Sequence, residues 1–120
     1  MHDVEQVPER WRLAIVEVVH RLVVRDYAGL AQDGFVRDAT TTVDDSVGDW
    51  IEDYPATLVE LPSEAWLHAS CGKIKTERGA WWLVVDLWTK EEGRSDLSLE
   101  GTVRDDGTNV RVEIANVHVI

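Results

Sequence analysis

The first element that the pattern of apolar and polar positions predicts is a long amphipathic helix. Between residues 7 and 25, apolar side chains recur every three or four positions, as they do on one face of an α-helix. The side chains on this face are Trp11, Ile15, Val18, Val19, Leu22 and Val23. Asp26 predicts the N-cap of a second, short helix, which Gly34 ends in a left-handed conformation.

A third helix is predicted over residues 42–54, where Pro55 stops it. Its apolar face consists of Val43, Val47, Trp50, Ile51 and Tyr54. Residues 57–61 predict a short extended segment, and Pro62 predicts the start of a helical turn that carries Ala65, Trp66 and Leu67.

After Gly79 the apolar period shortens from that of a helix to that of a strand. Residues 80–89 are apolar on both alternating faces, which predicts a central strand covered on both sides. Residues 95–104 alternate between apolar and polar positions and predict a strand with one wet face. A weaker strand is predicted at residues 73–76.

The most specific local signal is a hairpin turn at residues 105–108, because its Asp-Gly pair tolerates the positive φ angles of a tight turn. The alternation then resumes but changes phase before Val117. Either a bulge at Ala115 and Asn116 or a strand buried on both faces explains this change. Helices followed by strands predict one α+β domain over residues 1–120, with the N-terminal helices packed on an antiparallel meander of three to four strands.

The composition is that of a compact acidic domain. The 120 residues include 12 Lys and Arg against 23 Asp and Glu, which gives a net charge of −11. No basic stripe offsets this charge, so nucleic-acid binding is not expected. The longest apolar run, residues 81–85, is far too short for a membrane span. A lone Cys71 and the absence of an export signal predict a cytoplasmic protein.

The negative charge is concentrated in residues 33–64, which hold nine acids and one base and thus carry −8. Five of these acids lie on the polar side of the third predicted helix: Asp44, Asp45, Asp49, Glu52 and Asp53. They form either a solvated helix face, a docking surface for a basic protein partner, or a divalent-cation site.

No phosphate-binding loop, zinc motif or nucleophile elbow is present, so no cofactor and no metal is expected. Asp86 shares a strand face with Trp88. In apolar surroundings its carboxyl group would have a raised pKa and could act as a general base, with His118 or Tyr54 nearby in a pocket. Alternatively, it simply pairs with an arginine such as Arg94.

Residues 86–100, DLWTKEEGRSDLSLE, resemble the hallmark stretch of an uncharacterised bacterial domain family, and the ending NVHVI is similar to its C-terminus. The resemblance implies no known activity, but it draws attention to a loop at residues 89–96. The charged residues Glu91, Glu92, Arg94 and Asp96 either fix this turn or form a recognition surface. The order of elements also resembles the nuclear-transport-factor-like and cystatin-like cone, which implies a pocket under a curved sheet.

The sequence therefore favours a protein-binding module, of inhibitor or immunity type, that presents the acidic helix or the charged loop to a basic partner. The alternative is a small-molecule pocket protein or an acid/base enzyme of the nuclear-transport-factor-like type centred on Asp86. The missing catalytic set makes an enzyme the less expected of the two. The oligomeric state stays open.

Overall fold

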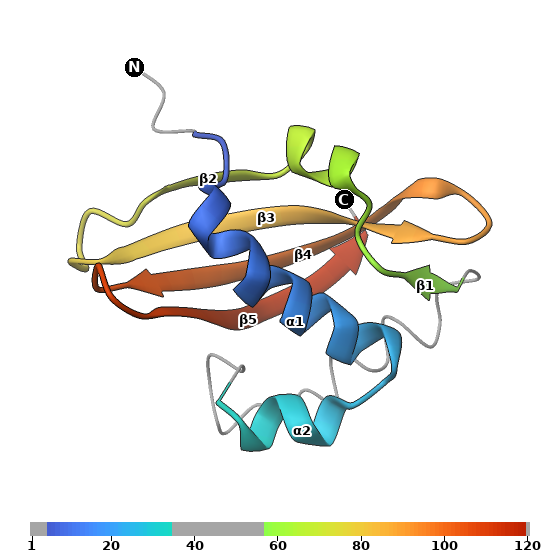
Figure 1. Cartoon of the computed structure of the whole chain (residues 1–120), viewed down its shortest axis with the longest axis horizontal. Coiled ribbons are helices and arrows are strands. Elements are labelled where there is room, and N and C mark those ends of the chain that lie inside the picture. Colours follow the sequence, from blue (N-terminus) through green and yellow to red (C-terminus); the bar gives the residue numbers. More distant parts are fainter. Residues whose placement is uncertain (1–4, 35–56, 120) are drawn as a thin grey trace.

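The computed structural model describes residues 5–34 and 57–119, so the helix predicted at residues 42–54 lies outside the described residues. Two helices precede the strands, as predicted. The elements are η1 (Glu9–Trp11), α1 (Arg12–Val23), α2 (Tyr27–Gln32), β1 (Leu58–Val59), η2 (Ser63–Leu67), β2 (Ser70–Lys73), β3 (Ala80–Thr89), β4 (Gly93–Asp105) and β5 (Val110–Val119), where η marks a 3-10 helix. The fold is α+β, with α1 lying across one face of a curled antiparallel sheet (Figure 1).

Strand β3 is the centre of the sheet, as its sequence predicted. The strand order is β1-β3-β4-β5, and β2 also pairs with β3. Leu83, for example, pairs with Cys71 of β2 on one side and with Gly101 of β4 on the other. The sheet has 5 strands rather than three or four, because β1 and β2 pair with different parts of β3.

The strand predicted at residues 73–76 is misplaced, because β2 ends at Lys73 and the residues after it form a turn. In this turn the N–H of Ile74 donates to the carbonyl of Ala80 at 3.0 Å, and the N–H of Glu77 donates to the carbonyl of Ile74 at 3.2 Å. Small residues such as Cys71 and Gly72 give β2 no apolar alternation, so the pattern did not reveal the strand.

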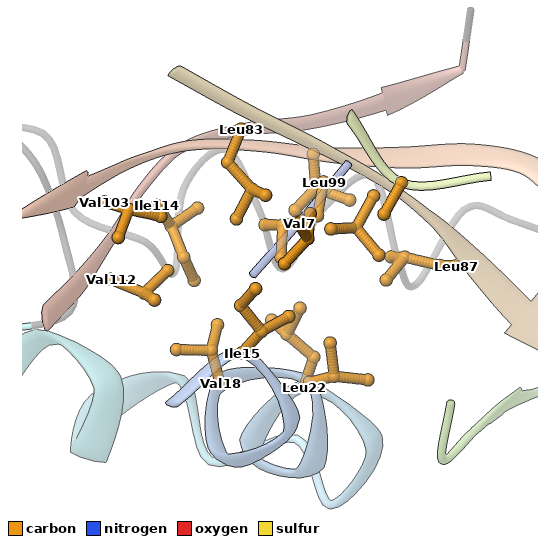
Figure 2. Packing of buried hydrophobic residues seen from close by; sticks show 14 of the residues in the cluster. Val7, Ile15, Val18, Leu22, Leu83, Leu87, Leu99, Val103, Val112 and Ile114 are labelled. Atoms are coloured by element: carbon orange, nitrogen blue, oxygen red, sulfur yellow. The ribbon is translucent and has the colours of Figure 1, made fainter. Parts of the chain in front are cut away.

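The core is one apolar layer between α1 and a single face of the sheet (Figure 2). Its members include Ile15, Val18 and Leu22 from α1, and Leu83, Leu87, Leu99, Val103, Val112 and Ile114 from β3, β4 and β5. Trp81 packs against this layer, and its ring meets that of Trp11 edge to face with 5.3 Å between the ring centroids.

The opposite face of β3 is only partly covered, which corrects the prediction of a strand buried on both sides. Trp82, Val84 and Trp88 on this face are half-buried, whereas Leu83, Val85 and Leu87 on the helix side are fully buried.

The prediction that the polar face of β4 is exposed to water is also wrong at two positions. Ser98 and Thr102 are 1% and 4% exposed. They pair in register with Asp86 and Trp82, and directly paired residues have neighbouring Cβ atoms on one face. The larger side chains of the partner strand therefore shield the short hydroxyl side chains from water.

Two further local predictions are confirmed. Glu100 pairs with Asn116 and Gly101 pairs with Ile114, so Ala115 is left out of the ladder as a bulge. A Cβ on Gly101 would lie 2.6 Å from the carbonyl oxygen of Glu113, so this close approach of β4 and β5 requires glycine. The turn between these strands holds Gly107 at a φ of +92°, as the Asp-Gly signal predicted.

The one-sided core predicts very different costs for two leucine truncations on the same helix. Leu22 is 0% exposed and Leu13 is 85% exposed. Leu22→Ala should lower the free energy of unfolding by about 2–5 kcal/mol, because it leaves a cavity in the apolar layer. Leu13→Ala, the matched control, should change it by less than about 0.5 kcal/mol. Chemical denaturation measures both, and equal losses would contradict the packing of α1 described above.

Candidate functional site

Asp86 lies on the half-buried face of β3, and its carboxylate already has two partners. Ser98 Oγ donates a hydrogen bond to Asp86 Oδ1 at 2.9 Å. Arg94 Nε lies 3.6 Å from Asp86 Oδ2. Of the two possibilities that the sequence left open for Asp86, the geometry is that of the arginine pair.

An irregularity in the β3–β4 ladder directs Arg94 to this position. Between Asp86 and Trp88 the chain advances two residues on β3, whereas their partners Ser98 and Arg94 are four residues apart on β4. The buried hydroxyl of Ser95 fills the gap in the ladder, since it donates to the carbonyl of Leu87 at 2.8 Å and accepts the N–H of Leu97 at 3.1 Å. Such irregularities reorient nearby side chains.

A hollow of about 250 Å³ opens at this position, lined by Asp86, Arg94, Ser95, Asp96 and Ser98. This volume is slightly below the range of about 300–1,000 Å³ that is usual for ligand pockets. His118 is the backbone partner of Ser98, which places it in the same cross-strand row as Asp86. Tyr54, the other residue predicted here, lies outside the described residues.

The imidazole of His68 extends this polar cluster. Its Nδ1 accepts a hydrogen bond from Arg94 at 2.6 Å. The thiol of Cys71 is buried and lies 3.6 Å from the carbonyl oxygen of Glu5. Burial raises the pKa of Cys71 to about 11, so the thiol stays protonated at neutral pH and is a weak nucleophile.

The predicted loop at residues 89–96 is shorter than expected, because Thr89 pairs with Gly93 and only three residues separate β3 from β4. Two of its acids fix local structure. The Glu91 carboxylate accepts the N–H of Thr57 at 2.7 Å, and Glu92 accepts the hydroxyl of Thr89 at 3.2 Å. The hydrogen bond from Thr57 holds the pKa of Glu91 below its usual range.

The acids of the predicted third helix, Asp44, Asp45, Asp49, Glu52 and Asp53, lie outside the described residues. The chain on both sides of them is described, and it is attached to the sheet at two points. Arg111 donates to the carbonyl of Gly34 at 2.7 Å, and Glu91 of the β3–β4 turn binds Thr57.

A second hollow, larger than the one at Asp86, is one that the sequence did not suggest. It has a volume of about 640 Å³ and lies where the β2–β3 and β4–β5 turns meet. We name it the arginine cleft, because three of its lining residues are arginines. The lining residues are Arg78, Gly79, Arg104, Asp105, Asp106, Asn109 and Arg111.

Among residues 5–34 and 57–119, no group of three or more His, Cys, Asp or Glu residues could hold a metal ion. Within the same residues, no helix has the length and apolar character that crossing a membrane requires.

Asp105, in the wall of the arginine cleft, makes a specific prediction about acid stability. Its carboxylate accepts the indole N–H of Trp11 at 2.7 Å and the N–H of Gly107 at 2.9 Å, which together lower its pKa. A lowered pKa in the folded state stabilises the protein above the unfolded pKa of about 3.9, and this stabilisation is lost as pH falls through the folded pKa.

Asp105→Asn should therefore destabilise the protein at neutral pH and flatten the decline of its unfolding free energy below about pH 4. Urea denaturation over a series of pH values measures both effects. Asp96→Asn removes an exposed carboxylate from the same strand and serves as the control. Identical pH profiles for the two variants would show that the bonds of Asp105 contribute nothing.

Comparison with known proteins adds a family but no activity. No curated protein and no solved structure matches the chain. The resemblance to the nuclear-transport-factor-like and cystatin-like cone therefore remains a prediction. One family model, a domain of unknown function named DUF7668, matches residues 19–120, which include all five strands. The chain belongs to the DUF7668 family, whose function is unknown.

Proposed function

We propose that this protein is a cytoplasmic protein-binding module that captures a basic partner through its acidic segment, residues 33–64. The observation that carries the proposal is the concentration of charge in this segment. It holds −8 of the net −11, although it is only about a quarter of the chain. An asymmetric charge distribution of this kind accelerates the encounter with an oppositely charged protein and orients it.

The attachment of the segment to the sheet supports this proposal. Just inside its start, Gly34 accepts a hydrogen bond from Arg111 of β5. Further along, Thr57 is held by Glu91 and also accepts the N–H of Lys90 at 2.9 Å through its carbonyl. Six acids lie between these two attachment points, against the single base Arg37. A charged surface that is tied to a rigid scaffold loses less conformational entropy when it binds.

Asp33, at the start of the acidic segment, contacts an arginine that it shares with two neighbouring acids. Arg21 of α1 meets three carboxylates, those of Glu17 at 3.0 Å, Asp26 at 3.3 Å and Asp33 at 2.8 Å. Hydrogen bonds to Glu17 and Asp33 raise the pKa of Arg21, which therefore stays charged. One positive charge thus contacts three negative ones where the acidic segment begins.

The alternative, an acid/base enzyme or small-molecule pocket at Asp86, has less support. Its carboxylate already binds Ser98 and lies next to Arg94, and a base that is occupied by an ion pair abstracts protons poorly. The hollow beside it is also small. The row that contains Asp86, Ser98 and the backbone of His118 is the one feature in favour of this alternative.

The proposal predicts salt-sensitive binding of a basic probe, here an oligolysine peptide titrated by calorimetry. The triple variant Asp45→Asn, Asp49→Asn, Asp53→Asn should bind it about tenfold more weakly at low salt, because each exposed charge contributes only a fraction of a kcal/mol to about 1 kcal/mol. High salt should weaken the wild type to a similar level.

A matched control removes three carboxylates elsewhere: Glu5→Gln, Glu9→Gln and Asp96→Asn, all of which are exposed. It changes the net charge equally, so it should weaken binding by no more than about twofold if the acidic segment is the docking surface. Circular dichroism checks that both variants stay folded. Equal losses in the two triple variants, or binding that is unaffected by salt, would refute the proposal.

A further inference from the structure

The arginine cleft lies at one end of the sheet, at the opposite end from the β3–β4 turn (Figure 1). Two turns meet there, and the N–H of Asp105 donates to the carbonyl of Gly79 at 2.9 Å. Gly79 has a φ of +75°, and a Cβ at this position would lie 3.1 Å from the carbonyl oxygen of Asp105. A glycine at position 79 thus allows the backbones of the two turns to approach each other, and their contact forms one wall of the cleft.

The two aspartates of the cleft interact with groups other than its three arginines. Asp105 accepts from Trp11 and Gly107 and also pairs with Arg10 at 3.0 Å. Asp106 accepts the N–H groups of Thr108 at 2.8 Å and Asn109 at 2.7 Å. Their hydrogen bonds come from Trp11 and from the backbone of the β4–β5 turn.

The neighbouring acids Glu77 and Glu113 are also occupied. Arg104 donates to Glu77 through Nη1 at 2.7 Å and to Glu113 through Nε at 3.0 Å. This leaves its second terminal nitrogen, Nη2, without a hydrogen bond to either acid.

The remaining arginines provide unused donors. Arg78 is exposed, and no described residue forms a hydrogen bond or ion pair with it. Arg111 donates through one terminal nitrogen to Gly34, its Nε lies 3.9 Å from a carboxylate oxygen of Glu113, and its side chain is 54% exposed. Because a guanidinium carries several N–H groups, the cleft has more donors than acceptors. An oxyanion that entered the cleft would therefore meet N–H groups that no other described residue occupies.

We infer that the arginine cleft binds a small molecule carrying carboxylate or phosphate groups. The planar guanidinium fork matches both kinds of oxyanion and binds them with two parallel hydrogen bonds. The volume of about 640 Å³ is within the range of about 300–1,000 Å³ for ligand sites. Arg111 of the cleft also donates to the carbonyl of Gly34 in the acidic segment, but anion binding in the cleft does not depend on the function proposed for that segment.

Calorimetric titration of the whole chain with citrate and with inorganic pyrophosphate tests the inference and separates the two sources of oxyanion. At least one probe should bind with a Kd below about 1 mM at low salt. Arg78→Gln should weaken this binding about tenfold, since a hydrogen bond to a charged group is worth about that factor. Arg78→Lys keeps the charge but loses the fork and should give an intermediate affinity.

Lys90→Gln is the matched control, because it removes the same charge from the β3–β4 turn at the other end of the sheet. It should change the affinity by less than about twofold. The inference is overturned if neither probe binds below about 1 mM, or if Arg78→Gln and Lys90→Gln weaken binding equally. It is also overturned if only an oligoglutamate peptide binds in an Arg78-dependent way, because the cleft would then dock an acidic chain.

Discussion

The packing of α1 against one face of the sheet is the constraint on which the rest of the structure depends. Ile15, Val18 and Leu22 are buried against apolar side chains that β3, β4 and β5 present with period two. Burying this layer fixes the register of the strands, because a shift of one residue would turn the apolar side chains of β3 away from the helix.

This register decides where the charged groups lie. With Leu83, Val85 and Leu87 facing α1, Asp86 must face the other side, where Ser98 and Arg94 reach it. The two interruptions of the ladder, at Ser95 and at Ala115, allow long strands to follow the curl of the sheet without losing the buried face. The same pairing brings the β2–β3 and β4–β5 turns together, and the arginine cleft results from this meeting.

Much of the fold follows from local patterns that one sequence contains. The helix at α1, the central strand β3, the Asp-Gly turn and the bulge at Ala115 were predictable, because periodicity and turn chemistry act over a few neighbouring residues. Strand β2 was predicted at residues 73–76, a few residues beyond its position at Ser70–Lys73. Its sequence has no alternation of apolar and polar residues, and the strand is stabilised by pairing with β3. The burial of Ser98 and Thr102 was missed for a similar reason, because it depends on the side chains of the neighbouring strand.

The candidate sites were predicted less well, because each joins residues that are distant in the sequence. The pairing of Asp86 with Arg94 was one of the two alternatives that the sequence left open. The contact of His68 with Arg94 was not predictable, because it depends on the position of the chain after η2. The sequence contained one indication of the arginine cleft, because the predicted hairpin places Arg104 opposite Arg111. Its third arginine, Arg78, joins them only because the antiparallel pairing of β3 and β4 brings Gly79 next to Asp105.

Amide hydrogen exchange followed by NMR tests the central claim, which is that β3 is the innermost strand under α1. The N–H groups of Leu83 and Val84, which lie between β2 and β4, should be among the slowest to exchange and should open only with global unfolding. Amides along the outer edge of β5 should exchange faster. Exchange at Leu83 and Val84 as fast as at that edge would contradict the placement of β3 and the packing that depends on it.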